Sequence, residues 1–234
     1  MTTARVLQDL TPLEQLRAGR MPRRLVQLVL GLVLFGVSLA MVLRSGLGLS
    51  PWDVLHLGIS RSTPLSIGTV VVLMSLAVLA LWIPLRQAPG LGTIANALLV
   101  GAVIDLSLKV VPDVDHLALQ VPMLVAGVVL NALGGALYIG AQLGTGPRDG
   151  LMTGLSRQTG LSLRLVRTGI EVTALAAGWL LGGTVGLGTV LYAIAVGPLV
   201  QRFLPWCVVV VEKPGPRRSQ PAEPESPGPV TPGP

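Results

Sequence analysis

Long apolar runs separated by short polar or glycine-rich stretches dominate this chain. A run of about 18 residues, wound as a helix, crosses roughly 30 Å of hydrocarbon. The segments that reach this length are 25–43, 65–85, 91–108, 117–141, 161–182 and 186–206. The pattern therefore predicts an all-α membrane protein, a six-span helical bundle.

The same pattern contains an internal repeat without gaps. Residues 31–106 recur as residues 127–202 at a constant offset of 96, so that Gly48 corresponds to Gly144. Each copy holds three predicted spans, and an odd number of spans inverts the second copy in the membrane. The repeat predicts two three-span units related by a pseudo-two-fold axis in the membrane plane, as in many secondary transporters.

Composition supports a membrane location. Hydrophobic residues make up 51% of the chain and charged residues only 12%, and the mean hydropathy is +0.71. In soluble domains about a quarter of all residues are charged. A soluble domain is therefore not expected.

The segments that flank the predicted membrane domain, 25–206, are polar. Within residues 1–24, Thr11-Pro12-Leu13-Glu14 has the form of a capping box and predicts a short cytoplasmic helix. The first apolar run is too long for the core of a cleaved signal peptide, so we expect it to remain as an anchor. Residues 207–234 are rich in proline, glycine, glutamate and serine, which is typical of a disordered cytoplasmic tail.

Basic residues predict the orientation. With six spans and a cytoplasmic N-terminus, only Arg44, Arg61 and Lys109 of the 17 basic residues fall outside. This asymmetry follows the positive-inside rule and predicts that both termini lie in the cytoplasm. The bilayer is the expected partner, with anionic lipid as a candidate on the cytoplasmic side. No nucleic-acid partner is expected, and an oligomer is left open.

Two shorter segments, 51–60 and 147–156, lie at equivalent places in the repeats. Ten residues of helix reach about 15 Å, half the hydrocarbon thickness. We interpret them as interfacial or re-entrant half-helices, although counting them as spans would give eight spans and parallel repeats. Each follows a helix-start signal, Ser50-Pro51 in one copy and Gly146-Pro147 in the other.

Each half-helix carries an aspartate at its third position, Asp53 and Asp149, near the positive end of the helix dipole. In the structural interpretation these carboxylates only complete the helix ends. In the functional interpretation the two ends face each other across the pseudo-axis and form a central substrate or ion site, as broken helices do in transporters. The sequence does not choose between them.

Charged groups inside the predicted spans are the second kind of candidate, because each is costly in hydrocarbon. Glu171 lies one helical turn beyond Arg167 and two beyond Arg164, so the three can share one face. One hypothesis is an intrahelical ion pair. The other is a carboxylate that faces substrate or exchanges a proton.

Other polar groups of the spans suggest helix packing rather than chemistry. Asp105 corresponds to Gln201 in the repeat, and both stay candidates for a substrate or ion site. We interpret Asn96, Asn131 and Gln201 mainly as interhelical hydrogen-bonding groups. His56 and His116 are isolated, the only cysteine is Cys207, and no glycine-rich stretch has the form of a P-loop. We expect no enzyme, cofactor or metal site.

Four motifs resemble the YczE-like family of bacterial integral membrane proteins over residues 24–204. The resemblance implies a multi-pass protein of the bacterial inner membrane, with no established substrate. The motifs are Gly48-Leu49-Ser50-Pro51-Trp52-Asp53-Val54-Leu55, Gly144-Thr145-Gly146-Pro147-Arg148-Asp149-Gly150-Leu151, Arg164-Leu165-Val166-Arg167-Thr168-Gly169-Ile170-Glu171 and Gly197-Pro198-Leu199-Val200-Gln201.

Two functions remain. One is a small secondary transporter or exporter of an unknown small molecule. The other is a membrane-embedded accessory or regulatory protein whose polar groups only hold helices together. A transporter needs water-accessible space that reaches Asp53, Asp149 or Glu171 at the centre of the membrane.

Overall fold

The computed structural model describes residues 7–8 and 10–211, which form helices and no strand. The all-α prediction is confirmed for these residues. Most of the predicted tail, residues 212–234, lies outside the described residues, as do residues 1–6 and 9. The helices are α1 Pro12–Arg17, α2 Met21–Ser45, α3 Pro51–Ser62, α4 Ile67–Trp82, α5 Leu91–Leu108, α6 Leu117–Gly140, α7 Pro147–Thr159, α8 Leu163–Leu180 and α9 Leu187–Cys207.

Four of these helices are long and apolar enough to cross a membrane: α2, α5, α6 and α9. A fifth span results if α3 and α4, which meet at a bend of 118°, form one broken span. α4 alone has 16 residues, and α8 carries Arg164, Arg167 and Glu171. The structure thus supports several membrane spans, and the six-span arrangement stays a prediction.

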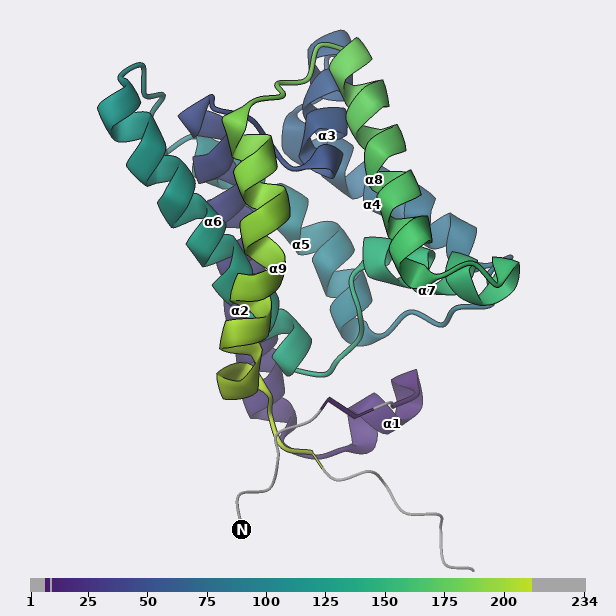
Figure 1. The fold of residues 1–234 in the computed structure, drawn as a ribbon. Coiled ribbons are helices and arrows are strands. Elements are labelled where there is room, and N and C mark those ends of the chain that lie inside the picture. Colours follow the sequence, from purple (N-terminus) through teal and green to yellow (C-terminus); the bar gives the residue numbers. More distant parts are fainter. Residues whose placement is uncertain (1–6, 9, 212–234) are drawn as a thin grey trace, which may run out of the picture.

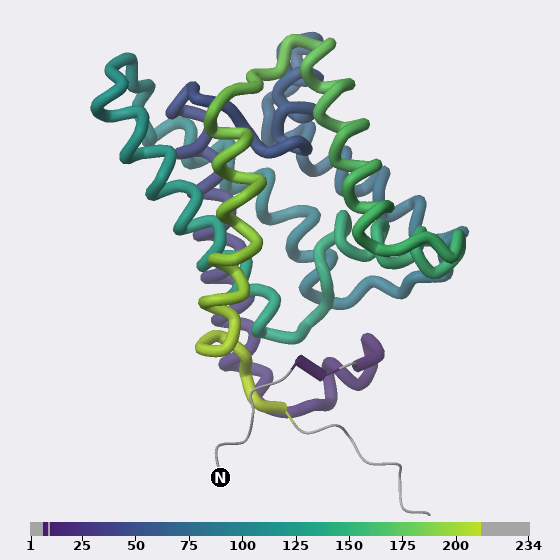
Figure 2. The backbone as a smooth tube through the Cα atoms, viewed as in Figure 1, coloured from purple at the N-terminus to yellow at the C-terminus, as the bar shows by residue number. Residues whose placement is uncertain are grey.

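Each helix from α6 to α9 begins 96 residues after one of the helices from α2 to α5, as Pro147 follows Pro51. Figure 1 shows α3 near the upper end of the bundle and α7 in its lower half. The smooth path in Figure 2 shows that α1 and the end of α9 lie together at the lower end.

Close packing of α2 on α6 forms the centre of the bundle. A β-carbon on Gly31 would lie 2.6 Å from the backbone nitrogen of Tyr138, and one on Gly127 would lie 2.7 Å from the Val42 side chain. The start of α2 therefore meets the end of α6, and the start of α6 meets the end of α2. The two helices run antiparallel, at a separation that only glycine permits.

The short helix predicted before the first span is present as α1. The hydroxyl of Thr11 accepts from the backbone N–H of Glu14 at 3.4 Å, and the Glu14 carboxylate accepts from the Thr11 N–H at 2.9 Å. These reciprocal bonds are the predicted capping box.

Arg24 joins α1 and α2 to the loop after α6. Its side chain is fully buried. Nε donates to the Ala141 carbonyl at 2.8 Å, and Nη2 donates to the Gln142 carbonyl at 2.6 Å. Because the last carbonyls of a helix have no partner within it, the guanidinium stabilises the end of α6.

Residues 208–211 pack beside this loop. The Val209 N–H donates to the Gly140 carbonyl at 3.0 Å, and Val209 and Val211 are buried with Leu10 and Ala18. The prediction that the disordered tail begins at residue 207 is therefore wrong for this valine-rich stretch, which buries apolar side chains and continues as an ordered segment.

The glycine contact between α2 and α6 should control stability. Gly31→Ala would place a methyl group against backbone, which cannot move aside, and we expect it to destabilise the protein by about 1–3 kcal/mol. The matched control is Gly169→Ala on α8, where a β-carbon meets no atom within 4 Å. That change should be neutral or slightly stabilising. Melting temperatures in detergent measure both, and equal effects would contradict the packing described.

Candidate functional site

The half-helices begin as the sequence predicts. Ser50 caps α3, since its hydroxyl accepts from the Asp53 N–H at 3.3 Å, and Pro51 occupies the first helical position. Gly146 precedes α7 without a side-chain cap, and Pro147 follows it. The chain reverses before each half-helix at a glycine with positive φ, Gly48 at 118° and Gly144 at 127°.

Backbone hydrogen bonds tie each of these reversals to the opposite half of the chain. The Gly92 N–H at the start of α5 donates to the Leu143 carbonyl at 2.7 Å. The Gly188 N–H at the start of α9 donates to the Leu47 carbonyl at 2.8 Å. The two bonds are equivalent under the repeat, and they position both half-helices from outside their own half.

The starts of the two half-helices meet. Nη2 of Arg148, from α7, lies 3.5 Å from Nδ1 of His56 and 3.8 Å from Oδ1 of Asp53, both from α3. The Arg148 guanidinium also lies over the Trp52 ring, 5.0 Å from its centroid. One long side chain, Arg148, thus links the starts of the two half-helices, whose main chains do not pack closely on each other.

Asp53 is a buried and well-partnered carboxylate. The Ser50 hydroxyl donates to its Oδ2. His56 Nδ1 lies 3.3 Å from its Oδ1, and the His56 side chain is 1% exposed. With Arg148 as a third partner, Asp53 is held in the manner of a structural group.

Asp149 differs from Asp53 both in its exposure and in its partners. It is exposed, and its Oδ2 accepts a hydrogen bond from the Tyr138 hydroxyl at 3.3 Å. Among the described residues it has no ion pair within 4.0 Å. The carboxylate at the start of α7 is therefore less covered by protein than Asp53.

Glu171 forms the ion pair that one hypothesis predicted. Arg167 Nε lies 2.9 Å from Glu171 Oε1, with 63% and 31% of the two side chains exposed. Arg164 is exposed and has no ion pair among the described residues, so the three charges do not form one cluster. Arg167 and Glu171 nevertheless lie close enough to act electrostatically on Asp149.

The remaining candidates lie elsewhere. Asp105 binds the start of α4: its carboxylate accepts from the Gly68 N–H at 2.9 Å and from the Ser66 hydroxyl at 2.5 Å. Asn96 and Gln201 make no side-chain hydrogen bond within the described chain, and their interhelical bonding stays a prediction. Gln201 is exposed because α9 does not pack along α8 there.

Asn131 does link helices. Its amide donates to the Ser38 hydroxyl at 2.9 Å and accepts from the Tyr192 hydroxyl at 2.7 Å.

Four residues of this region were not predicted as site residues: His56, Tyr138, Arg148 and Tyr192. Only His56 had a signal in the sequence, because a residue three places after Asp53 lies on the same helix face.

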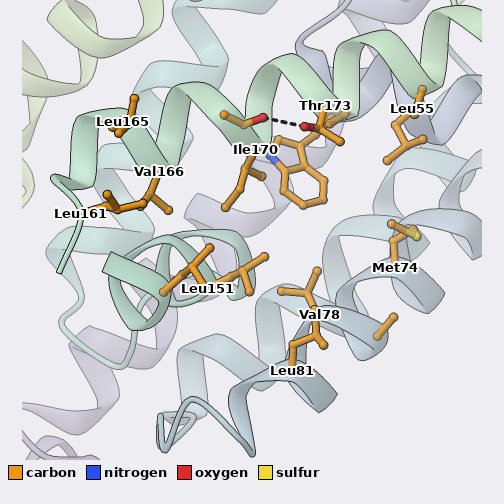
Figure 3. Close-up of a pocket in the computed structure, with 16 residues that line it drawn as sticks. Leu55, Met74, Val78, Leu81, Leu151, Leu161, Leu165, Val166, Ile170 and Thr173 are labelled. Atoms are coloured by element: carbon orange, nitrogen blue, oxygen red, sulfur yellow. Dashed lines mark hydrogen bonds between the residues drawn. The ribbon is translucent and has the colours of Figure 1, made fainter. Parts of the chain in front are cut away.

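An apolar pocket of about 610 Å³ lies between α4 and α8, bounded by α3 and α7. Figure 3 shows Leu151, Val78 and Ile170 pointing into it. The Thr173 hydroxyl donates a hydrogen bond to the Gly169 carbonyl at 2.8 Å. Trp52 lines the pocket and carries Arg148 over its ring, so the indole separates this apolar space from the charged groups.

The described residues contain no group of three or more histidine, cysteine, aspartate or glutamate side chains placed to hold a metal ion. The chemistry that the cluster offers is charge pairing and hydrogen bonding.

Comparison with known proteins gives a family without an assigned activity. Residues 22–205 match the family described as "Family of unknown function (DUF6198)". The chain is 39% identical over 177 residues to an uncharacterized protein of Haemophilus influenzae, covering 76% of this chain and 81% of that protein. It is 34% identical over 172 residues to the uncharacterized membrane protein YczE of Bacillus subtilis, covering 73% and 80%. No solved structure is a significant match.

The two aspartates should respond differently to neutralisation. Asp53→Asn removes the shared partner of His56 and Arg148, and we expect it to lower the free energy of unfolding by about 1–3 kcal/mol. Asp149→Asn changes an exposed group, for which about 0.5 kcal/mol or less is expected. Melting temperatures in detergent measure the difference. A larger loss in Asp149→Asn would show that the structural roles are reversed.

Proposed function

We propose that this chain, which belongs to the DUF6198 family of unknown function, is a small secondary transporter or exporter. Membership with YczE confirms the resemblance seen in the sequence, and the apolar helices agree with a multi-pass membrane protein. The observation that carries the proposal is the meeting of two half-helix starts beside the exposed Asp149. A protein that only holds helices together has no need of a solvent-exposed carboxylate there.

We further propose that the two halves are inverted repeats with six spans. The antiparallel contact of α2 with α6 supports this, since equivalent helices of inverted repeats run in opposite directions. The equivalent bonds at Gly92 and Gly188 support it as well. The half-helices then enter from opposite membrane faces and end at the same central site.

One half of the molecule is closed. α4 packs along α5, where a β-carbon on Gly101 would collide with the Gly68 carbonyl. Asp105 holds the two helices together through Gly68 and Ser66. This closure lies at the end of the bundle away from α1, because the neighbouring Leu108 carbonyl contacts Arg44 at the end of α2.

The equivalent place in the other half is open. α8 packs on α3 and α7 rather than along α9, and a β-carbon on Gly197 would meet no atom within 4 Å. Arg164 stands where the first half has Gly68, and Gln201 stands where it has Asp105. We propose that transport exchanges the two arrangements, so that closing α8 on α9 accompanies opening of α4 from α5.

The alternative is an accessory protein that docks a partner or anionic lipid through its cytoplasmic basic surface. The fully partnered Arg24, Asp53 and Asn131 favour it, since these polar groups serve packing alone. It does not explain the exposed Asp149 or the unequal halves, so we place it second.

Disulfide crosslinks test the exchange in a Cys207→Ala background. The pair Ser66→Cys with Asp105→Cys should crosslink in membranes, because the native side chains touch. The equivalent pair, Ser162→Cys with Gln201→Cys, should crosslink only when the second half closes. We expect both pairs to react, with each crosslink preventing the reaction of the other pair. Failure of the second pair while the first forms fully would contradict alternation and favour the accessory protein.

Labelling tests the orientation. We propose that both termini are cytoplasmic, with the exposed Asp115 on the opposite side of the membrane. Asp115→Cys, again without Cys207, should react with a membrane-impermeant thiol reagent in intact cells. A cysteine at exposed Arg202, near the end of α9, should react only after permeabilisation. The reverse pattern would invert the assignment.

A further inference from the structure

We propose that a second cavity, at the end of the bundle away from α1, binds a short organic carboxylate. The cavity has a volume of about 270 Å³, and its lining comes from the ends of α2 and α5, from α3, and from the loop between α8 and α9. Figure 1 shows α3 and this loop at the upper end of the bundle. The proposal concerns binding alone and goes beyond transport, because it does not depend on any exchange between α4 and α8.

The lining of this cavity carries a net positive charge. Its charged residues in the described chain are Arg44, Arg61 and Asp113, two cations against one anion. Nη1 of Arg44 is paired with Oδ1 of Asp113. Arg61 has no ion pair within 4.0 Å among the described residues. One guanidinium charge in the lining is therefore not neutralised by the protein.

Several hydrogen-bond donors of the lining also have no acceptor in the described chain. Arg44 Nη2 donates to the Leu108 carbonyl at 2.7 Å, but Arg44 Nε is buried and makes no hydrogen bond. Nη1 of Arg61 donates to the Gly182 carbonyl at 2.6 Å, and its other N–H groups donate to no described residue. The Thr184 hydroxyl makes no side-chain hydrogen bond there either. A buried N–H without an acceptor is unfavourable, so an acceptor that reaches it stabilises the complex.

The ligand chemistry follows from this lining. A cation is disfavoured by the net charge, whereas the planar guanidinium matches the two oxygens of a carboxylate. The rest of the lining is apolar, with Leu43, Leu49 and Leu57 among its residues. A bare inorganic anion would place a strongly hydrated ion against these side chains. A carboxylate with a short alkyl chain satisfies both parts, and the cavity lies just below the range of about 300–1,000 Å³ for drug-sized ligands.

The repeat supplies an internal comparison. Arg61 corresponds to Arg157, which is also exposed. Arg44 corresponds to Gly140, and Thr184 corresponds to Ala88, neither of which has a side-chain donor. The second half therefore repeats one arginine of the cavity without the groups that complete the site, and Arg157 is the matched control for Arg61.

Calorimetry with the purified full chain in detergent tests the ligand class. The four compounds to titrate are sodium butyrate, 1-butanol, butylammonium chloride and sodium phosphate, at constant sodium chloride. We expect saturable heat for butyrate, none for 1-butanol or butylammonium, and weaker binding of phosphate. Absence of saturable butyrate binding would overturn the proposal. Saturation by 1-butanol or butylammonium, or phosphate binding as tight as that of butyrate, would do so as well.

Variants place the carboxylate in this cavity. Arg61→Gln should weaken butyrate binding about tenfold, the effect of one charged hydrogen bond, whereas Arg157→Gln should leave it unchanged. Asp113→Asn removes the negative charge of the lining and should strengthen binding roughly threefold.

Unchanged affinity in a folded Arg61→Gln, an equal loss in Arg157→Gln, or weaker binding in Asp113→Asn would overturn the proposal. If Arg61→Gln does not fold because it loses the bond to Gly182, Thr184→Val takes its place. This variant removes only the hydroxyl and keeps the shape of the side chain. Unchanged affinity in Thr184→Val would then overturn the proposal.

This proposal and the proposed transport can fail separately. Butyrate binding without crosslinking of Ser162→Cys to Gln201→Cys would leave a carboxylate-binding protein that does not alternate. Crosslinking of both pairs without butyrate binding would leave the transport proposal standing and remove this site.

Discussion

Two backbone hydrogen bonds, from Gly92 to Leu143 and from Gly188 to Leu47, are the constraint on which this structure depends. Breaking a helix inside a membrane leaves backbone groups that hydrocarbon cannot satisfy, at a cost of several kcal/mol each. Here the Leu143 and Leu47 carbonyls, in the reversals before α7 and α3, each accept a hydrogen bond from the first turn of a helix of the opposite half. Each half-helix is therefore positioned in part by the opposite half of the chain.

The shared backbone plan carries different side chains in the two halves. Trp82 fills the space beside Gly150 and donates from its indole to the Pro147 carbonyl at 3.0 Å. In the other half the large and small residues are exchanged, so that Gly178 of α8 packs against Val54 and Leu55 of α3. The aspartates differ in the same way: Asp53 is buried and held by Ser50, His56 and Arg148, while Asp149 is exposed and bonded to Tyr138.

The helix starts could be predicted from the sequence because their signals are local. The capping box at Thr11 and the helix starts at Pro51 and Pro147 depend on residues within one turn, and the structure has them where predicted. The contact of Arg148 with Asp53 joins residues from different half-helices, and no spacing reveals it. The bonding of Gln201 likewise depends on whether α8 lies against α9, which local spacing does not reveal.

α8 shows how the charge pattern and the fold constrain each other. Its residues Val166, Ile170 and Ala174 line the apolar pocket, while Arg167 and Glu171 lie on a different face of the helix. A lipid-facing surface does not carry an ion pair with 63% of one partner exposed, because ionised groups within a membrane face the bundle interior or water. We therefore expect the charged face to border water rather than lipid. α8 packs on α3 and α7 rather than along α9, so α9 does not cover this face. The charges that make α8 a poor membrane span thus lie on the face that the neighbouring helices leave uncovered.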